Sequence, residues 1–131
     1  MTGATRLVLI GTALALFAGA ASAAPLPKHV GQCALTKVKS VETRLEDGDT
    51  HEPVEGSGSA VSFVNGGYQV SYDTVAAVEH SRAGDRVKLC LVSIPHPCPP
   101  GDNRGRQYRT TNLRTHKSWL LPDAEHMCGG A

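Results

Sequence analysis

The sequence lacks the short motifs that would identify a metal site or a catalytic centre. It contains no CxxC pair, so the close ligand spacing of structural zinc sites and the redox pair of thiol enzymes are both missing. It also contains no HExxH or HxH pattern for a metal and no GxSxG turn for a nucleophilic serine. The closest approach to that turn, residues 56–60, ends in Ala60. We therefore predict a protein without enzymatic activity, bound metal or cofactor.

Net charge is also lacking once the N-terminal segment is set aside. The chain has 13 Lys and Arg residues and 12 Asp and Glu residues, and removal of Arg6 makes the two numbers equal. This balance excludes a generally basic nucleic-acid binder. The charges are segregated, however, because residues 42–55 contain six acidic residues and one basic residue, whereas residues 82–117 contain eight basic residues and two acidic ones. The asymmetry fits either a cationic surface for an anionic partner or two solvated loops of opposite sign that attract each other.

The only long apolar run is at the N-terminus. Arg6 precedes the apolar residues 7–20, and the small residues Ala21, Ser22 and Ala23 follow them. This order is typical of a secretory signal peptide and is too short for a membrane anchor. We predict cleavage after Ala23, with residues 1–23 as the signal and residues 24–131 as one exported domain, periplasmic or secreted. The mature part has no second apolar run, so we expect no membrane span there.

Four cysteines in a small exported domain favour two disulfides over metal ligation. Sequence alone allows three pairings. We favour Cys33–Cys90 and Cys98–Cys128, since the second bridge would tie a Pro-rich corner to a C-terminal tail that has little else to hold it.

Turn signals divide the remaining chain into short segments typical of strands. Alternating residues on both sides of Asn65-Gly66-Gly67 predict a β-hairpin. Residues 33–46 carry apolar residues at helical spacing but also many Thr and Val residues, so both a helix and a long bent strand are open and we favour the strand. Residues 73–81 are predicted as a third strand, with a helical turn at 75–78 as the alternative.

The second half of the chain predicts the central and final strands. Residues 86–94 have apolar residues at both alternating sets of positions, so we expect a central strand that is buried on both faces. Residues 107–113 and 117–121 are the last predicted strands. Five to seven short strands indicate an all-β fold, and we favour a small, partly open β-barrel of the OB or SH3-like kind with two disulfides.

The Pro-rich corner and the Arg- and Gly-rich turn after it, residues 95–106, form the predicted functional face. Guanidinium groups suit carboxylates and phosphates, and neighbouring aromatic rings could supply a stacking surface. The candidate binding residues are His96, Arg104, Arg106, Tyr108, Arg109 and Trp119. Arg114 is expected on the same face as Arg106, with Arg109 on the other. The alternatives are that the Arg residues solubilise an outward face or pair with the acidic loop, and that Trp119 fills the core.

Three functions remain open. We favour a non-enzymatic binding or inhibitor module of a bacterial-type cell envelope, with an anionic envelope polymer or an acidic protein surface as its partner. The first alternative is a small exported enzyme or metal-binding protein that uses His96, Asp123 and His126. The second is a structural envelope component. In size, compartment and expected architecture the chain resembles the small periplasmic lysozyme inhibitors, with which it shares no motif. The sequence does not define the ligand or the oligomeric state.

Overall fold

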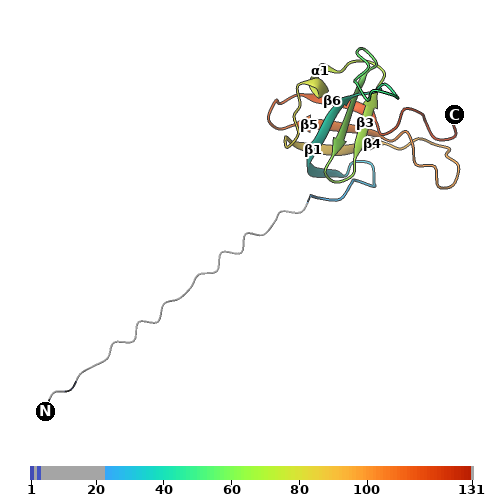
Figure 1. Cartoon of the computed structure of the whole chain (residues 1–131). Coiled ribbons are helices and arrows are strands. Elements are labelled where there is room, and N and C mark those ends of the chain that lie inside the picture. The colour runs from blue at the N-terminus through green and yellow to red at the C-terminus, as the bar shows by residue number, and fades with distance from the viewer. Residues whose placement is uncertain (2, 4–22, 131) are drawn as a thin grey trace.

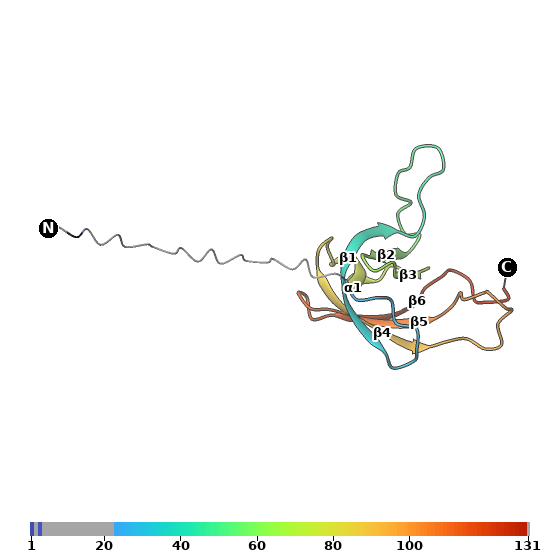
Figure 2. The ribbon, with the colours of Figure 1, turned by 90° about the horizontal axis from the view of Figure 1, so that it is seen from below.

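The computed structural model describes residues 1, 3 and 23–130, so most of the predicted signal peptide lies outside the described residues. One antiparallel sheet of six strands in the order β3-β2-β1-β4-β5-β6 forms the domain. Figure 1 shows the elements in chain order: β1 (Cys33–Thr43), β2 (Ser59–Phe63), β3 (Tyr68–Ser71), α1 (Ala76–Glu79), β4 (Arg86–Ser93), β5 (Gln107–Asn112) and β6 (Ser118–Pro122). The predicted all-β fold is confirmed, and the sheet curls into a half-barrel (Figure 2).

β1 is the long bent strand on which the curl depends. Its first part pairs with β4, from Cys33 opposite Cys90 to Lys37 opposite Arg86. Its second part pairs with β2, after a register shift between Val38 and Ser40. Ala34, Thr36 and Val38 are buried between exposed neighbours, which is the two-residue period of a strand. The preference for a strand over a helix at residues 33–46 is therefore confirmed.

The predicted hairpin is also confirmed. β2 and β3 pair around the Asn65-Gly66-Gly67 turn, where Gly66 has a φ of 87°. The backbone N–H of Phe63 donates to the carbonyl oxygen of Gly67 at 2.9 Å and closes the turn.

The third strand predicted at residues 73–81 is wrong, and the helical alternative is right. The segment forms the short helix α1, whose start is held by Ser59: the backbone N–H of Val75 donates to Ser59 Oγ at 2.9 Å. Ser59 Oγ in turn donates to a carboxylate oxygen of Glu79 at 2.6 Å. The helical turn places Val78 in the core, fully buried. An extended strand would not bury Val78 while Val75 and Glu79, on either side of it, both bond to Ser59.

Burial of β4 on both faces is also wrong. Val87, Leu89 and Leu91 face the core, whereas Val92 is 39 % exposed. The half-barrel covers only its inner face, so the outward positions of β4 meet solvent. Cys90 takes one of these outward positions because it bonds to Cys33 directly opposite on β1.

The edge strands of the half-barrel, β3 and β6, lie against each other, and a buried glutamine joins them. Gln69 on β3 is fully buried, and its Nε2 donates to the carbonyl oxygens of Tyr108 at 2.7 Å and Leu121 at 3.0 Å. Its Oε1 accepts from Thr110 Oγ1 at 2.6 Å and from Trp119 Nε1 at 2.8 Å. The side chain of Gln69 therefore links β3 to β5 and β6, whereas neighbouring strands elsewhere in the sheet are linked by backbone hydrogen bonds.

The N-terminal lead-in packs against the inner face of the half-barrel. Leu26 is packed against the hydrophobic core, and the Tyr108 hydroxyl donates to the carbonyl oxygen of Pro27 at 3.3 Å. Asn65 Nδ2 donates to the carbonyl oxygen of Ala24 at 3.1 Å. Within the part of the chain that the structure describes, no helix is long and apolar enough to cross a bilayer.

Candidate functional site

Both predicted disulfides are present, and the second one defines the candidate site. Cys98 in the Pro-rich corner bonds to Cys128 in the C-terminal tail. The backbone N–H of Cys128 also donates to the carbonyl oxygen of Arg104 at 3.1 Å. The loop between β4 and β5 and the tail after β6 therefore form one unit at this end of the barrel, at the right of Figure 1. Two disulfides are typical of a protein from an oxidising compartment.

Asp123 fixes the turn that leads from the loop into β5. One of its carboxylate oxygens accepts from the backbone N–H groups of Gly105 at 2.8 Å and Arg106 at 3.0 Å. Burial raises the pKa of Asp123, and these two amide donors oppose the rise. Only glycine fits at position 105, which has a φ of 92° and would place a Cβ 2.7 Å from Met127 Sδ. The two hydrogen bonds to the Asp123 carboxylate therefore hold the backbone of this turn in place.

Arg104, the first of the predicted binding arginines, is engaged within the protein. Its Nε and Nη2 donate to the two carboxylate oxygens of Asp102 at 2.9 and 2.8 Å. Nη2 also donates to the carbonyl oxygen of Gly130 at 3.1 Å, and Asp102 accepts from the backbone N–H of Gly129 at 3.0 Å. The hydrogen bond from Arg104 holds the pKa of Asp102 well below its usual range. Arg104 therefore neutralises a neighbour and anchors the tail.

The tail is attached at a further point, to Arg44 just after β1. Arg44 Nη1 lies 3.5 Å from a carboxylate oxygen of Glu125, and Arg44 Nε donates to the carbonyl oxygen of Ser57 at 2.7 Å. The guanidinium also lies 4.4 Å from the centre of the Tyr72 ring. The tail after β6 forms no helix or strand within the described residues, but it is held at several points along its length.

Arg106 is the loop arginine that makes no ion pair within the described residues. Its Nη2 donates to Asn103 Oδ1 at 3.1 Å, while its buried Nε–H has no partner of hydrogen-bond geometry. Its charge lies near the Tyr108 hydroxyl: burial raises the pKa of Tyr108, and Arg106 opposes that rise. A buried N–H without a partner is rare in proteins.

Two hollows share the turn residues Gly101, Asp102 and Asn103. The first, of about 240 Å³, is lined on its other side by residues of the Pro-rich corner, including Pro95 and His96, and by Arg106. The second, of about 630 Å³, extends to Asp123 and Ala124. His96 and Arg106, both candidate binding residues, therefore line the same hollow.

The possible metal ligands His96, Asp123 and His126 do not come together in the structure. Among residues 23–130 no three His, Cys, Asp or Glu side chains lie close enough to share a metal ion. His96 borders the smaller hollow, the Asp123 carboxylate holds backbone amides, and His126 is exposed on the tail.

The predicted stacking surface is wrong. Tyr108 is 1 % exposed and Trp119 is 5 % exposed, so neither ring is available to a ligand. Both belong to the core because β5 and β6 direct alternate residues inward, and Trp119 is further fixed by its bond to Gln69. The alternative interpretation of Trp119 as a core residue is confirmed.

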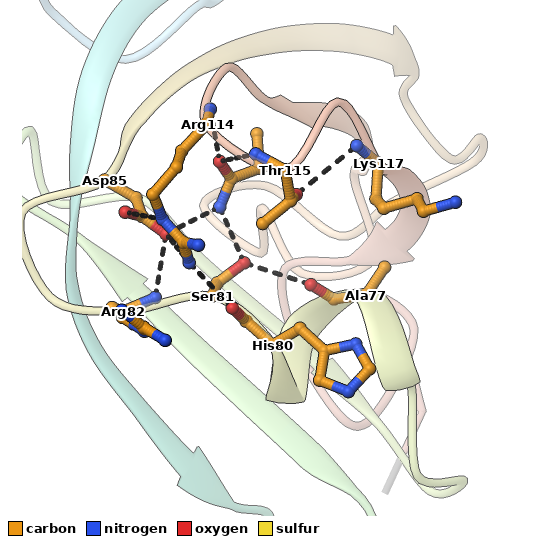
Figure 3. Close-up of polar contacts among 9 residues, drawn as sticks. Ala77, His80, Ser81, Arg82, Asp85, Arg114, Thr115 and Lys117 are labelled. Carbon is orange, nitrogen blue, oxygen red and sulfur yellow. Dashed lines mark hydrogen bonds and ion pairs between the residues drawn. The ribbon is translucent and has the colours of Figure 1, made fainter.

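Arg114 lies at the other end of the barrel from Arg106, so the expected common face is also wrong. β5 ends at Asn112, and Arg114 follows in the turn before β6, where its Nε and Nη2 donate to Asp85 at 2.6 and 2.8 Å (Figure 3). Asp85 also accepts from Asn112 Nδ2 at 2.9 Å and from the backbone N–H of Arg82 at 2.9 Å. The hydrogen bond from Arg114 depresses the pKa of Asp85 far below its usual range.

This cluster joins two turns and is not a catalytic triad. Ser81 Oγ donates to the carbonyl oxygen of Ala77 at 3.0 Å and accepts from Asn112 Nδ2 at 2.9 Å. The imidazole of His80 points away from both Ser81 and Asp85 (Figure 3). His80 is therefore not placed to act as a base for the serine hydroxyl.

Arg109 lies on the outer face of the sheet, exposed and opposite Cys90. Four further basic residues share this face and were not among the predicted site residues: Lys37, Lys39, Arg86 and Lys88. Their signal in the sequence is the alternation of Lys or Arg with buried valine, in Lys37-Val38-Lys39 and in Arg86-Val87-Lys88. The acidic loop, residues 46–58, extends away from the body of the domain (Figure 2).

Fold and site together define a small, disulfide-bonded half-barrel domain with a fixed loop at one end and a cationic outer sheet face. Comparison of this chain with protein-family models, with curated proteins and with solved structures finds no significant match.

Proposed function

We propose that this protein is an exported, non-enzymatic binding or inhibitor module, periplasmic or secreted, whose contact surface is the loop of residues 95–106. The loop is closed by Cys98–Cys128 and by the bonds of Asp123 and Asp102 to its backbone and to the tail. A segment that is ordered before binding loses little conformational entropy when it contacts a partner. Rigidity of this kind favours recognition of a folded partner.

The observation that carries this proposal is Arg106 at the edge of the smaller hollow. Arg106 is half-buried, its side chain makes one hydrogen bond within the described residues, to Asn103, and the hollow that it borders is about 240 Å³, with His96 also at its edge. A carboxylate fits such a place because a guanidinium binds it through parallel N–H bonds. We therefore assign to the loop an acidic side chain or terminal carboxylate of a partner protein.

Site-specific photo-crosslinking in the native exported fraction tests the proposal. A photoreactive residue replaces Pro100, which is exposed in the loop, or Ala83, which is exposed at the opposite end of the barrel. We expect a discrete crosslinked species from position 100 alone. It should disappear with Arg106→Ala and persist with Arg82→Ala, a charge removal remote from the loop. Equal crosslinking from both positions, or persistence in Arg106→Ala, would contradict the proposal.

Neither alternative function has support from a specific contact. An enzyme or metal site built on His96, Asp123 and His126 needs side chains that converge, and the Asp123 carboxylate is committed to two backbone amides. A structural envelope component needs no fixed loop.

A further inference from the structure

The outer face of the sheet carries a second surface, separate from the loop. The five basic side chains Lys37, Lys39, Arg86, Lys88 and Arg109 are all exposed on it. The strand segments that present this face, residues 33–39, 86–93, 107–112 and 118–122, contain no Asp or Glu. Within the described residues, none of the five side chains takes part in an ion pair or a hydrogen bond. The charge of this face is therefore uncompensated, unlike that of Arg104 and Arg114.

Strand register arranges the five residues in a diagonal stripe. Lys37 on β1 is directly opposite Arg86 on β4. Lys88 lies two positions further along β4, and Arg109 on β5 lies opposite Cys90, diagonal to Lys88. Lys39 extends the row at the β1 end. With the usual spacings along and between strands, the stripe is roughly 20 Å long.

One pair in the stripe acts against the stability of the sheet. Like charges directly opposite each other on neighbouring strands are destabilising, and Lys37 and Arg86 are such a pair. Neither side chain forms an ion pair with a carboxylate within the described residues. A bound anion that lies along the stripe would remove the repulsion.

We infer that this stripe binds a linear polyanion of the cell envelope, a polymer with carboxylate, sulfate or phosphate groups repeated along its length. The shape of the charge favours a polymer: the stripe is long and narrow, and none of its five residues lines the hollows beside the loop. A linear chain can meet all five cations in succession and fix the protein to the envelope while the loop remains free.

The test measures binding of the mature protein to dextran sulfate, with uncharged dextran as the reference polymer. The double variant Lys88→Gln/Arg109→Gln removes two charges from the middle of the stripe. Its matched control, Lys28→Gln/Arg82→Gln, removes one exposed Lys and one exposed Arg elsewhere. We expect the stripe variant to bind about ten- to thirtyfold more weakly than the control. The slope of log affinity against log salt should fall by roughly 1.4 for the two lost contacts.

Three results would overturn the inference. These are equal affinity of the two double variants, no preference of the wild type for dextran sulfate over dextran, and full competition by a folded acidic protein at the same charge concentration. The last result would identify the face as a protein-docking surface. Because crosslinking from position 100 depends on Arg106 and polymer binding depends on Lys88 and Arg109, failure of one proposal is separable from failure of the other.

Discussion

Replacement of Gln69 by leucine tests how the half-barrel is closed. The side chain of Gln69 is the polar link between edge strands β3 and β6, with two donated and two accepted hydrogen bonds at 2.6 to 3.0 Å. Leucine is of similar size and apolar, so Gln69→Leu removes all four bonds without opening a large cavity. It leaves the Trp119 N–H and the Thr110 hydroxyl buried with no acceptor from β3.

The cost follows from these orphaned groups. An unsatisfied buried donor or acceptor costs about 1–3 kcal/mol. The Thr110 hydroxyl can rotate and the two carbonyl oxygens have further lone pairs, while the Trp119 N–H has no other direction. We expect Gln69→Leu to lower the free energy of unfolding by about 3–4 kcal/mol, a large share of the stability of a small domain.

Equilibrium urea unfolding with both disulfides intact, followed by Trp119 fluorescence, measures this loss. The control is Gln107→Leu on β5, a half-buried glutamine whose side chain makes no hydrogen bond within the described residues; we expect a change within about 0.5 kcal/mol. In the double variant Gln69→Leu/Trp119→Phe, followed by circular dichroism, the two costs should be less than additive because one orphan is removed. Equal effects of Gln69→Leu and Gln107→Leu would refute the reasoning.

Two further changes have defined outcomes. Asp85→Asn should lower the free energy of unfolding by about 2 kcal/mol near neutral pH, because it weakens the charged bonds to Arg114. Arg114 depresses the pKa of Asp85 below its usual value of 3.8, so this stabilisation is fully present above pH 3.8 and is lost as the pH falls below it. The urea midpoints of wild type and variant should therefore approach each other as the pH is lowered below 3.8. Gly58→Ala should lower the free energy of unfolding by more than about 3 kcal/mol, because a Cβ would overlap the carbonyl oxygen of Ser71. Gly66→Ala, also at positive φ but in open space, should lower it by about 1 kcal/mol. Equal melting temperatures of the two variants would disprove the clash.

Local patterns in the sequence predicted the strands and turns that depend on local chemistry. The Asn65-Gly66-Gly67 turn and the alternation of residues 33–39 identify their elements because turn geometry and pleat alternation are properties of neighbouring residues. The disulfide pairing was predicted from the need to hold the tail. The prediction of a strand at residues 73–81 was wrong because two hydrogen bonds with Ser59, which is distant in sequence, decide the conformation of this segment.

The candidate site was predicted only in part, since its side chains find their partners through strand register. Arg114 and Asp85 are 29 positions apart and meet because β4 and β5 align their turns. Tyr108 and Trp119 were assigned to a surface because an isolated strand does not reveal which of its two faces is covered. The basic stripe could have been predicted from the sequence, because antiparallel pairing with Cys33 opposite Cys90 puts Lys37 opposite Arg86.

The central claim is that the protein acts outside the cytoplasm as a disulfide-closed binding module. Mass spectrometry of the protein purified from the exported fraction, first native and then denatured, tests it most directly. We predict a chain that begins at Ala24, a mass four hydrogens below that of the reduced chain, and no metal retained under native conditions. A chain that still carries residues 1–23, free thiols at Cys98 and Cys128, or a stoichiometric metal ion would contradict the account.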